Sequence, residues 1–244
     1  MHAPLSLSTF AARAGEHQLQ YLGDAQFHTM FAEDLEPEVS ATLRAGARDQ
    51  VAFEQTLDFL GHRPFRTSLL CRAGRTLDRT LWWERLAGLH FSSRAQASER
   101  KDGLWMCRTR SGEPFGTDSA LVGEALQRLV DAWPRTVQFE ALCAPKDREV
   151  LGRNLLAAFA AQQVQLGTGD RGIEGVTARP RAASSARAQA VLGHSATNLW
   201  HERVGLEPGP RALLPLLDGS RTHGELNGLE GHLAGLAAAA LLIR

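Results

Sequence analysis

The sequence predicts an α+β protein in which helices dominate and a small central antiparallel sheet lies in the middle of the chain. Apolar residues recur at helical spacing over much of the 244 residues. Between residues 86 and 117 this period gives way to short runs that are typical of strands. A chain of this length can bury one large core or two modest ones, so length alone does not decide the number of domains.

Two helices are expected near the N-terminus. Residues 7–20 are expected to form the first, with Ser8 or Thr9 placed to cap its exposed amides. Pro37 is expected to open the second, because proline suits the first position of a helix. The apolar positions of this second helix repeat at helical spacing as far as Leu60.

Residues 54–71 predict a helix end, a sharp turn and a strand in succession. Gly61 favours a C-terminal cap and Pro64 cannot continue a helix, so the second helix is expected to end there. The short apolar run at residues 68–71 suits a buried strand. Four charged residues gather around this corner: Glu54, Asp58, Arg63 and Arg66.

The middle of the chain is expected to contain the sheet and a long helix. Short strands are expected at residues 86–92, 104–109 and 113–117. Ser111 and Gly112 predict a hairpin turn between the last two strands. Asp118 or Ser119 then caps a helix that Pro134 ends.

A linker is expected to divide the chain. Pro145 opens the last helix before it, and residues 167–187 are rich in Gly, Arg, Ala, Ser and Pro. The sequence therefore predicts an α+β region at 1–166, a linker, and a C-terminal helical module of winged-helix-like type at 188–244. Within this module, a turn is expected at residues 218–219 and helices are expected at residues 210–217, 222–229 and 231–242.

Charge and composition exclude some broad classes of function. The 27 basic and 27 acidic residues give a formal net charge of zero, so nothing indicates a general attraction to nucleic acid or to an anionic membrane. From Glu207 to Arg244 there are three arginines and four acidic residues. Because a DNA-binding surface needs a concentrated positive patch, the C-terminal module is not expected to bind DNA.

Cysteine usage and apolar runs predict a cytoplasmic protein. Cys71, Cys107 and Cys143 are single and widely spaced, which is typical of a reducing compartment. The N-terminus lacks the charged and apolar regions of a secretory signal. The longest apolar run, residues 233–243, is shorter than the roughly 20 residues that span a bilayer.

No pattern in this chain predicts a cofactor, a metal or a catalytic residue. Residues 167–172 match G-x-G-x-x-G, but a true phosphate-binding loop follows a buried strand and opens a helix. The residues that follow here are poor helix formers, so we interpret the segment as linker. The histidines are scattered outside metal-binding patterns, and Gly193–Thr197 lacks the second glycine of a nucleophile elbow.

The charged corner has two interpretations. Arg63 and Arg66, with His62, would suit a carboxylate or another anion, because the guanidinium group forms paired hydrogen bonds. The favoured interpretation is structural, and in it the arginines pair with Glu54 and Asp58 and fix the corner. An arginine-rich turn is also where a peptide or domain contact is expected.

Trp82 and Trp83 are a further candidate contact. Adjacent residues point in different directions, so one indole is expected to be buried and the other partly exposed. An exposed tryptophan is a good interface anchor, although a core role for both is favoured. The predicted interaction residues are thus Glu54, Asp58, Arg63, Arg66, Trp82 and Trp83.

The corner also carries a resemblance to a known family. With the upstream motifs Phe10–Gly15 and Leu19–Ala25, residues 54–71 resemble the methyltransferase regulatory domain. This module follows the cofactor-binding domain in certain S-adenosylmethionine-dependent methyltransferases, some of which resemble bacterial protein-lysine methyltransferases. A weaker third motif spans Thr197–Glu202 and is followed by Arg211–Gly219.

This resemblance implies an accessory function. Family members usually carry a catalytic domain ahead of these motifs, whereas Met1 here stands just ahead of the first one. The resemblance therefore implies a regulatory or substrate-presenting module that contacts a methyltransferase domain or polypeptide, and a protein substrate, while catalysis and its cofactor stay elsewhere. The alternative is a stand-alone enzyme with an anion-binding pocket lined by Arg63 and Arg66, which a deep cleft with a perturbed acid or base would favour.

Overall fold

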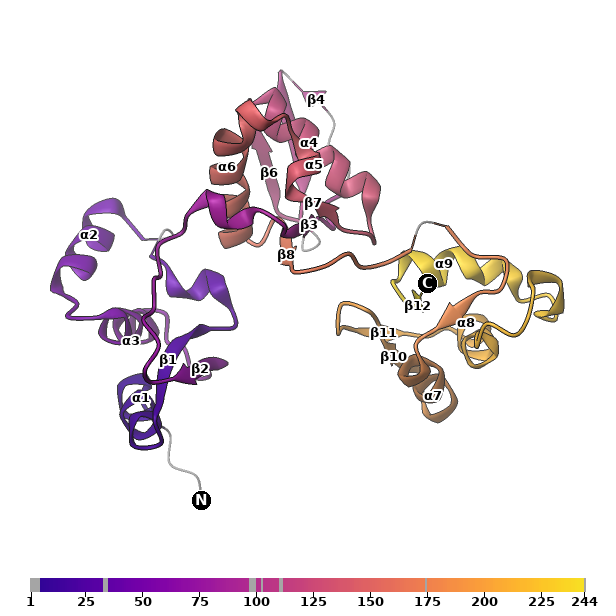
Figure 1. The fold of residues 1–244 in the computed structure, drawn as a ribbon, viewed down its shortest axis with the longest axis horizontal. Coiled ribbons are helices and arrows are strands. Elements are labelled where there is room, and N and C mark those ends of the chain that lie inside the picture. Colours follow the sequence, from indigo (N-terminus) through magenta and orange to yellow (C-terminus); the bar gives the residue numbers. More distant parts are fainter. Residues whose placement is uncertain are drawn as a thin grey trace. The chain divides into compact units, whose positions relative to one another are not determined.

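The computed structural model describes residues 5–32, 35–96, 100–101, 103–109, 112–173 and 175–243. The chain forms two compact units, residues 1–81 and residues 82–244. Their elements are drawn in Figure 1. The boundary between the units falls inside residues 1–166, for which the sequence predicts a single α+β region. The division into 1–166, 167–187 and 188–244 stays a prediction.

The first unit packs helices against a two-stranded antiparallel sheet. Its elements are α1 (Leu7–Glu16), β1 (Leu19–Asp24), η1 (Phe27–Met30), α2 (Pro37–Gly46), α3 (Gln50–Leu60) and β2 (Ser68–Arg72). In the sheet, Leu19 lies opposite Arg72 and Asp24 lies opposite Ser68. Apolar side chains from both helices and strands are buried in its core, among them Leu7, Ala14, Tyr21 and Phe53.

The first helix is shorter than predicted. It ends at Glu16 rather than at residue 20, because Gln18 takes the left-handed backbone conformation with φ of 58°. The following residues pair with β2, and this pairing satisfies backbone groups that a longer helix would have used. The N-terminal cap is Ser6, whose hydroxyl accepts a hydrogen bond from the Thr9 amide at 3.2 Å.

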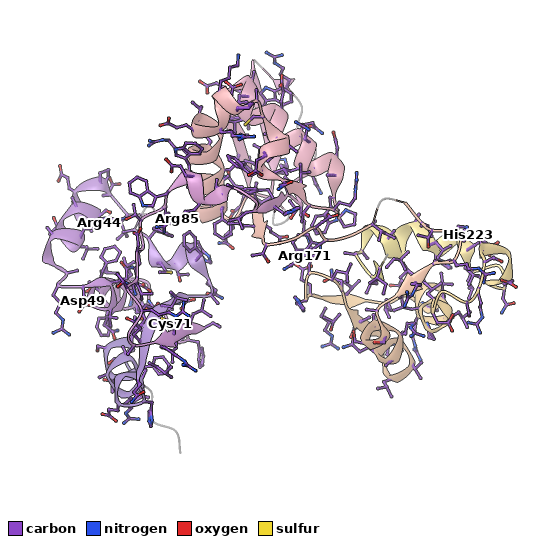
Figure 2. The ribbon with its side chains drawn as sticks, viewed as in Figure 1. Arg44, Asp49, Cys71, Arg85, Arg171 and His223 are labelled. Atoms are coloured by element: carbon purple, nitrogen blue, oxygen red, sulfur yellow. The ribbon has the colours of Figure 1, made fainter. Side chains whose placement is uncertain are left out.

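The predicted second helix is two helices, α2 and α3. Ala47 is extended, and Asp49 caps α3 by accepting a hydrogen bond from the Ala52 amide at 2.8 Å. Asp49 is labelled in Figure 2. The helical spacing of apolar residues continues across this break, so it did not reveal the new start. Aspartate is a preferred N-terminal cap, which explains why α3 begins here.

The middle part of the second unit contains most of its strands. Its elements are η2 (Trp83–Leu86), β3 (His90–Ser92), β4 (Arg100–Lys101), β5 (Leu104–Arg108), β6 (Pro114–Thr117), α4 (Ala120–Ala132), β7 (Val137–Gln138), α5 (Phe139–Leu142), η3 (Pro145–Asp147), α6 (Arg148–Ala160) and β8 (Gln165–Gly167). β3 pairs with β7 and β8, and β5 pairs with β4 and β6. We call the buried cluster here the middle core; it includes Leu86, Phe91, Leu129, Phe139, Leu151 and Leu155.

The C-terminal part of the second unit has a core of its own. Its elements are β9 (Arg181–Ala182), α7 (Ser184–Leu192), β10 (Ser195–Thr197), β11 (Arg203–Gly205), α8 (Pro208–Leu213), η4 (Leu214–Leu216), η5 (His223–Glu225), η6 (Glu230–His232), α9 (Leu233–Ala238) and β12 (Leu242–Ile243). β10 and β11 form an antiparallel hairpin, and β9 pairs with β12. We call this cluster the C-terminal core; it includes Ala186, Leu213, Leu214, Leu217, Leu226 and Leu236.

Most predictions for the middle part are confirmed. The strands expected at 104–109 and 113–117 are β5 and β6, and Ser119 caps α4. In the region 86–92 only the last three residues form a strand, because the chain up to Leu86 forms η2. Ser111, which was expected in the hairpin turn, lies outside the described residues.

Two of the predicted C-terminal helices are wrong in extent. Residues 222–229 contain only the short η5, because Asn227 and Gly228 have φ of 55° and 76°, which a right-handed helix cannot hold. The helix expected at 231–242 is limited to α9 and the short η6, because the chain end pairs with β9 as a strand.

The predicted α+β class is confirmed. Within the described residues, the strands form small antiparallel sheets of two or three strands each. They are therefore distributed over the chain rather than gathered in a single sheet. At the end of the predicted linker, residues 181–182 form β9 and residues 184–187 are the start of α7. None of the helices in the described ranges is long and apolar enough to cross a membrane.

Candidate functional site

The helix–turn–strand corner predicted at residues 54–71 is confirmed. α3 ends at Leu60, and the Gly61 amide donates back to the last helical turn at 2.9 Å. His62 then takes a φ of 48°, which turns the chain, and β2 begins at Ser68. The local signals of glycine and proline therefore located this corner correctly.

Arg66 lies at the centre of a buried charged cluster. Its Nε is 2.7 Å from Asp58 Oδ2, and its Nη1 is 2.8 Å from Glu54 Oε2. The same Nη1 donates to the Tyr21 hydroxyl at 2.9 Å, and that hydroxyl donates to Glu54 Oε2 at 2.6 Å. The Glu54 side chain has no exposed surface. One arginine therefore satisfies two carboxylates and a phenol.

Arg63 neutralises a third buried carboxylate. Its Nη2 is 3.1 Å from Asp24 Oδ1, and the Asp24 side chain has no exposed surface. Its Nη1 donates to Thr29 Oγ1 at 2.6 Å, whereas its separation from Asp58 is 3.9 Å. The favoured interpretation, in which the arginines pair inside the corner, thus describes Arg66 well. For Arg63 the main partner is one that the interpretation did not name.

Sequence reasoning missed the contributions of Tyr21 and Asp24 to this cluster. Both residues lie in β1, within the motif Leu19–Ala25 that carries part of the family resemblance. An ion pair of Asp24 and a hydrogen bond of Tyr21 join this motif to the one at residues 54–71. The signal that could have indicated this contact was the presence of polar residues in the motif Leu19–Ala25 and of arginines in the motif at residues 54–71.

Two pKa values in the cluster are shifted. Burial, followed by the hydrogen bond with Glu54, raises the pKa of Tyr21 above its ordinary value. Burial lowers the pKa of Arg66, but its hydrogen bonds with Asp58 and Glu54 outweigh this effect and raise it overall. Tyr21 therefore stays a neutral donor and Arg66 stays charged near neutral pH. Neither group is poised for proton transfer there.

A cavity of about 950 Å³ lies beside this cluster in the first unit. Arg63 and Arg66 take part in its wall, together with the apolar residues Leu5, Leu7, Phe10, Phe59, Pro64 and Phe65. Phe59 is 70% exposed and Phe65 is 86% exposed. Exposed aromatic residues around a hollow often mark a contact surface. We call this feature the Phe59–Phe65 cavity.

Trp82 and Trp83 belong to the second unit. One is more exposed than the other, as their adjacent positions predict, but the favoured core role for both is wrong for Trp82. Trp82 is 51% exposed, whereas Trp83 packs against the middle core. A Cβ added at Gly152 would lie 3.0 Å from the Trp83 Cβ, so α6 packs closely against the base of this side chain. An interface role for these tryptophans and for the charged corner stays a prediction.

The third motif, at residues 197–202, begins at the last residue of β10 and continues through the loop of the β10–β11 hairpin, residues 198–202, which we call the wing loop. Asn198 is buried, and its Oδ1 accepts hydrogen bonds from the amides of Trp200 and Glu202 at 2.9 and 3.0 Å. Its Nδ2 donates to the Ala239 carbonyl at 3.1 Å. Asn198 therefore folds the loop and ties it to the residue after α9.

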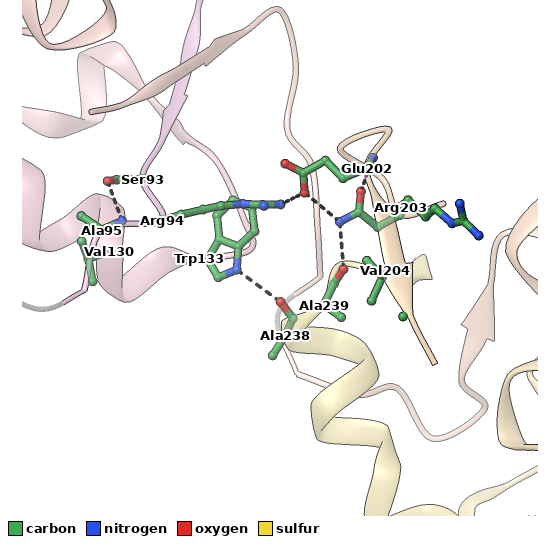
Figure 3. A pocket seen from close by; sticks show the side chains of 12 residues that line it. Ser93, Arg94, Ala95, Val130, Trp133, Glu202, Arg203, Val204, Ala238 and Ala239 are labelled. Atoms are coloured by element: carbon green, nitrogen blue, oxygen red, sulfur yellow. Dashed lines mark hydrogen bonds and ion pairs between the residues drawn. The ribbon is translucent and has the colours of Figure 1, made fainter. Parts of the chain in front are cut away.

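The wing loop contacts side chains from the middle part of the second unit, as Figure 3 shows. The rings of Trp200 and Trp133 stack with centroids 5.2 Å apart. Arg94 lies 4.3 Å from the Trp133 ring centroid and forms an ion pair with Glu202. Trp133 Nε1 donates to the Ala238 carbonyl at 3.2 Å. We call these contacts the wing junction; a cavity of about 460 Å³ lies there.

The glycine-rich segment at residues 167–172 does not have the geometry of a nucleotide loop. Gly167 ends β8, but in the described part of the following chain no helix begins before α7 at Ser184. Gly172 has φ of 81°, and an added Cβ would lie 2.7 Å from the Pro134 carbonyl oxygen. A close backbone approach thus explains this glycine.

Comparison with known proteins finds matches at both ends of the chain. Residues 2–72 match the family model described as "Predicted methyltransferase regulatory domain". Residues 178–239 match the model described as "PKMT, C-terminal winged helix domain". An uncharacterized protein of Rickettsia prowazekii (strain Madrid E), RP789, is 39% identical over 72 residues, which are 30% of this chain and 13% of that protein.

The fold is similar to that of two solved structures of PKMT2 from Rickettsia typhi. One matches with a TM-score of 0.84 and 19% identity over 98% of this chain and 59% of its own. The other, in complex with AdoHcy, matches with a TM-score of 0.78 and 21% identity over 93% of this chain and 49% of its own. This chain therefore spans between half and three fifths of those structures. Its residues 2–72 resemble a methyltransferase regulatory domain, and its residues 178–239 resemble the C-terminal winged helix domain of PKMT proteins.

Proposed function

We propose that this chain is a non-catalytic regulatory or substrate-presenting module of an S-adenosylmethionine-dependent methyltransferase system. The matches at residues 2–72 and 178–239 support this, because both families are named for methyltransferases. The similarity to PKMT2, one structure of which is a complex with AdoHcy, supports it further. On this proposal the partner is a methyltransferase domain or polypeptide. The module either presents a protein substrate to this partner or regulates its activity.

The Phe59–Phe65 cavity is the observation that carries this proposal. Phe59, Leu60 and Phe65 are 70%, 50% and 86% exposed, so their apolar surface is available to a partner. Burying such a side chain contributes about 1.5–3 kcal/mol. Aromatic anchors at the centre of an interface often account for much of the binding energy. We therefore place the contact with an apolar segment of the methyltransferase at this cavity.

The ion pairs of the charged cluster hold the backbone that carries this exposed apolar surface. Arg63 and Arg66 fix the turn between α3 and β2 through ion pairs, and this turn carries Phe65. A surface that is already ordered loses little conformational entropy when it binds. The predicted interaction residues Glu54, Asp58, Arg63 and Arg66 thus act by positioning the aromatic side chains. Trp82, which is half exposed, remains a separate candidate contact.

The alternative is a stand-alone enzyme that binds an anion at the corner arginines. Arg63 and Arg66 do line the cavity, but each lies within 3.1 Å of a buried carboxylate. An incoming anion would have to displace Asp24 or Asp58 and leave a buried charge unpaired. This cost favours the accessory function over anion binding.

We also place this function in the cytoplasm. Cys71, Cys107 and Cys143 all lie in described residues and form no disulfide. Free cysteines are typical of reducing compartments, where a module of this kind would meet its partner.

The proposal is tested with the purified chain as bait in a native extract. The retained proteins are identified by mass spectrometry and assayed for transfer of labelled methyl groups from S-adenosylmethionine. We expect a methyltransferase to be retained, and Phe65→Ala to weaken its retention at least tenfold. Leu192→Ala is the matched control, because Leu192 in α7 is 87% exposed but lies in the other unit.

Two results would contradict the proposal. Methyl transfer by the purified chain alone would show that the chain is itself an enzyme. Equal retention by the wild type and by Phe65→Ala would show that the contact lies outside the Phe59–Phe65 cavity.

A further inference from the structure

The second unit has two hydrophobic cores with few side chains between them. The middle core and the C-terminal core are separate clusters, connected by the chain between β8 and β9. Side-chain contacts from one part to the other gather at the wing junction. The behaviour of the unit therefore depends on how firmly these contacts hold.

Four side chains at the wing junction form a stack. Arg94 Cζ lies 4.3 Å from the ring centroid of Trp133, and the ring centroids of Trp133 and Trp200 are 5.2 Å apart. Arg171 lies 5.0 Å from the Trp200 centroid and comes from the chain between β8 and β9, where Figure 2 labels it. Glu202 pairs with Arg94, so the wing loop supplies both a ring and a carboxylate.

We propose that the wing junction is a releasable latch. In the closed state described here, the wing loop docks on Trp133. In the open state, the loop leaves Trp133 and the C-terminal core moves on the chain between β8 and β9. A small, polar interface between two cores normally permits relative motion, whereas a large apolar one does not. The Arg94 and Glu202 side chains are 16% and 32% exposed, so water reaches the ion pair.

Two buried polar atoms lower the free energy needed to open the latch. Among the described residues, Arg94 Nε and Trp200 Nε1 are buried without a hydrogen-bond partner. A buried donor without a partner is unfavourable, and both atoms gain water when the loop leaves. The closed junction is therefore less stable than its ring contacts alone suggest.

Release of the latch also changes the surface of the unit. Cavities of about 460 Å³ and about 120 Å³ both have Arg94 and Glu202 in their walls. Departure of Glu202 with the wing loop therefore opens both cavities at once. It also uncovers the Trp133 ring, which is an aromatic surface of the kind that anchors partners.

Limited proteolysis of the full chain tests the latch. Trypsin cleaves after Arg171, whose side chain lies against Trp200 in the closed state. Cleavage of a transiently open form follows the population of that form. We expect Trp200→Ala and Arg94→Glu to speed this cleavage about tenfold, because the loss of a stacked aromatic pair, or of a cation–π contact together with its ion pair, changes an equilibrium by about that factor. Cleavage after Arg75 in the first unit serves as the internal reference.

A pair of charge-reversal variants distinguishes release of the latch from misfolding of the variant. Arg94→Glu and Glu202→Arg should each speed cleavage after Arg171, and the double variant should restore slow cleavage by rebuilding the ion pair. Arg203→Ala is the control, because Arg203 neighbours Glu202 but bonds Ser195 within the hairpin. Unchanged cleavage in Trp200→Ala and in both single charge variants would overturn the latch. So would a double variant that is cleaved as fast as the single variants.

Discussion

The charged corner of the first unit and the wing junction of the second both use arginine to join distant segments, but they differ in burial. At the corner, Arg66 is 10% exposed and its partner Glu54 is fully buried. At the junction, Arg94 and Glu202 are 16% and 32% exposed. A buried network cannot lose one member without leaving an uncompensated charge, whereas a partly exposed pair can exchange its partner for water. The first arrangement therefore suits a fixed surface, and the second suits a movable one.

The largest expected effect is on stability, from Arg66→Ala. This change leaves Glu54 and Asp58 buried without their cation, so we expect the free energy of unfolding of the first unit to fall by about 3–5 kcal/mol. Urea unfolding followed by circular dichroism measures it. The control is Arg48→Ala, because Arg48 and Asp49 form an exposed pair whose loss changes stability by less than about 1 kcal/mol. A loss as small as the control's would contradict the account of the corner.

The second prediction concerns alkaline pH and Tyr21, the single tyrosine of the chain. Burial and the Glu54 hydrogen bond raise its pKa in the folded state, so the folded state holds the proton more tightly than the unfolded state. The unfolded state begins to lose this proton above about pH 10. The stabilisation is therefore complete below that pH, and the free energy of unfolding falls by at most about 1.4 kcal/mol per pH unit above it.

Absorbance at 295 nm reports this titration directly, because one phenolate contributes the signal. We expect the folded chain to ionise at higher pH than the urea-unfolded chain. Tyr21→Phe should lose this contribution to the fall in stability. Ionisation at the same pH in both states would show that Tyr21 is not buried against Glu54.

A smaller effect is expected at the wing junction. Arg94→Ala removes one partly exposed ion pair and one cation–π contact, so it should lower the free energy of unfolding of the second unit by about 1–2 kcal/mol. Thermal unfolding by calorimetry measures this change, with Arg203→Ala as the control. A loss as large as that of Arg66→Ala would mean that the junction is as fixed as the corner, and the comparison between them would fail.

The smallest effect on stability is expected from Phe65→Ala. The Phe65 side chain is 86% exposed, so its removal should change the free energy of unfolding by less than about 0.5 kcal/mol. Urea unfolding measures the change. A loss above about 1 kcal/mol would assign Phe65 to the core of the unit and would weaken its proposed role as an anchor for a partner.

The corner was predictable because its signals are local. Gly61 and Pro64 stop the helix within a few residues, and the charged side chains follow at short spacing. Their partner Asp24 was not predicted, because it reaches Arg63 only through the pairing of β1 with β2. A strand pairing of this kind depends on contacts far apart in the sequence, which a local pattern does not contain.

The wing junction was not predicted for the same reason. Arg94, Trp133 and Trp200 come from three separate segments, and no spacing rule connects them. The motif at residues 197–202 was recognised, but only the structure shows that Asn198 folds it and that Trp200 docks elsewhere in the unit. The missed break between α2 and α3 differs, because the capping residue Asp49 was readable in the sequence.

Hydrogen exchange of the unmodified chain, followed by mass spectrometry, tests the central comparison most directly. We predict that peptides covering β1 and α3 exchange only when the first unit unfolds as a whole, because the buried cluster joins them. The wing loop should exchange much faster than α7 and β10 beside it, which are anchored in the C-terminal core. A wing loop as protected as those elements, or a corner that exchanges as fast as the wing loop, would contradict the account of a fixed surface and a movable latch.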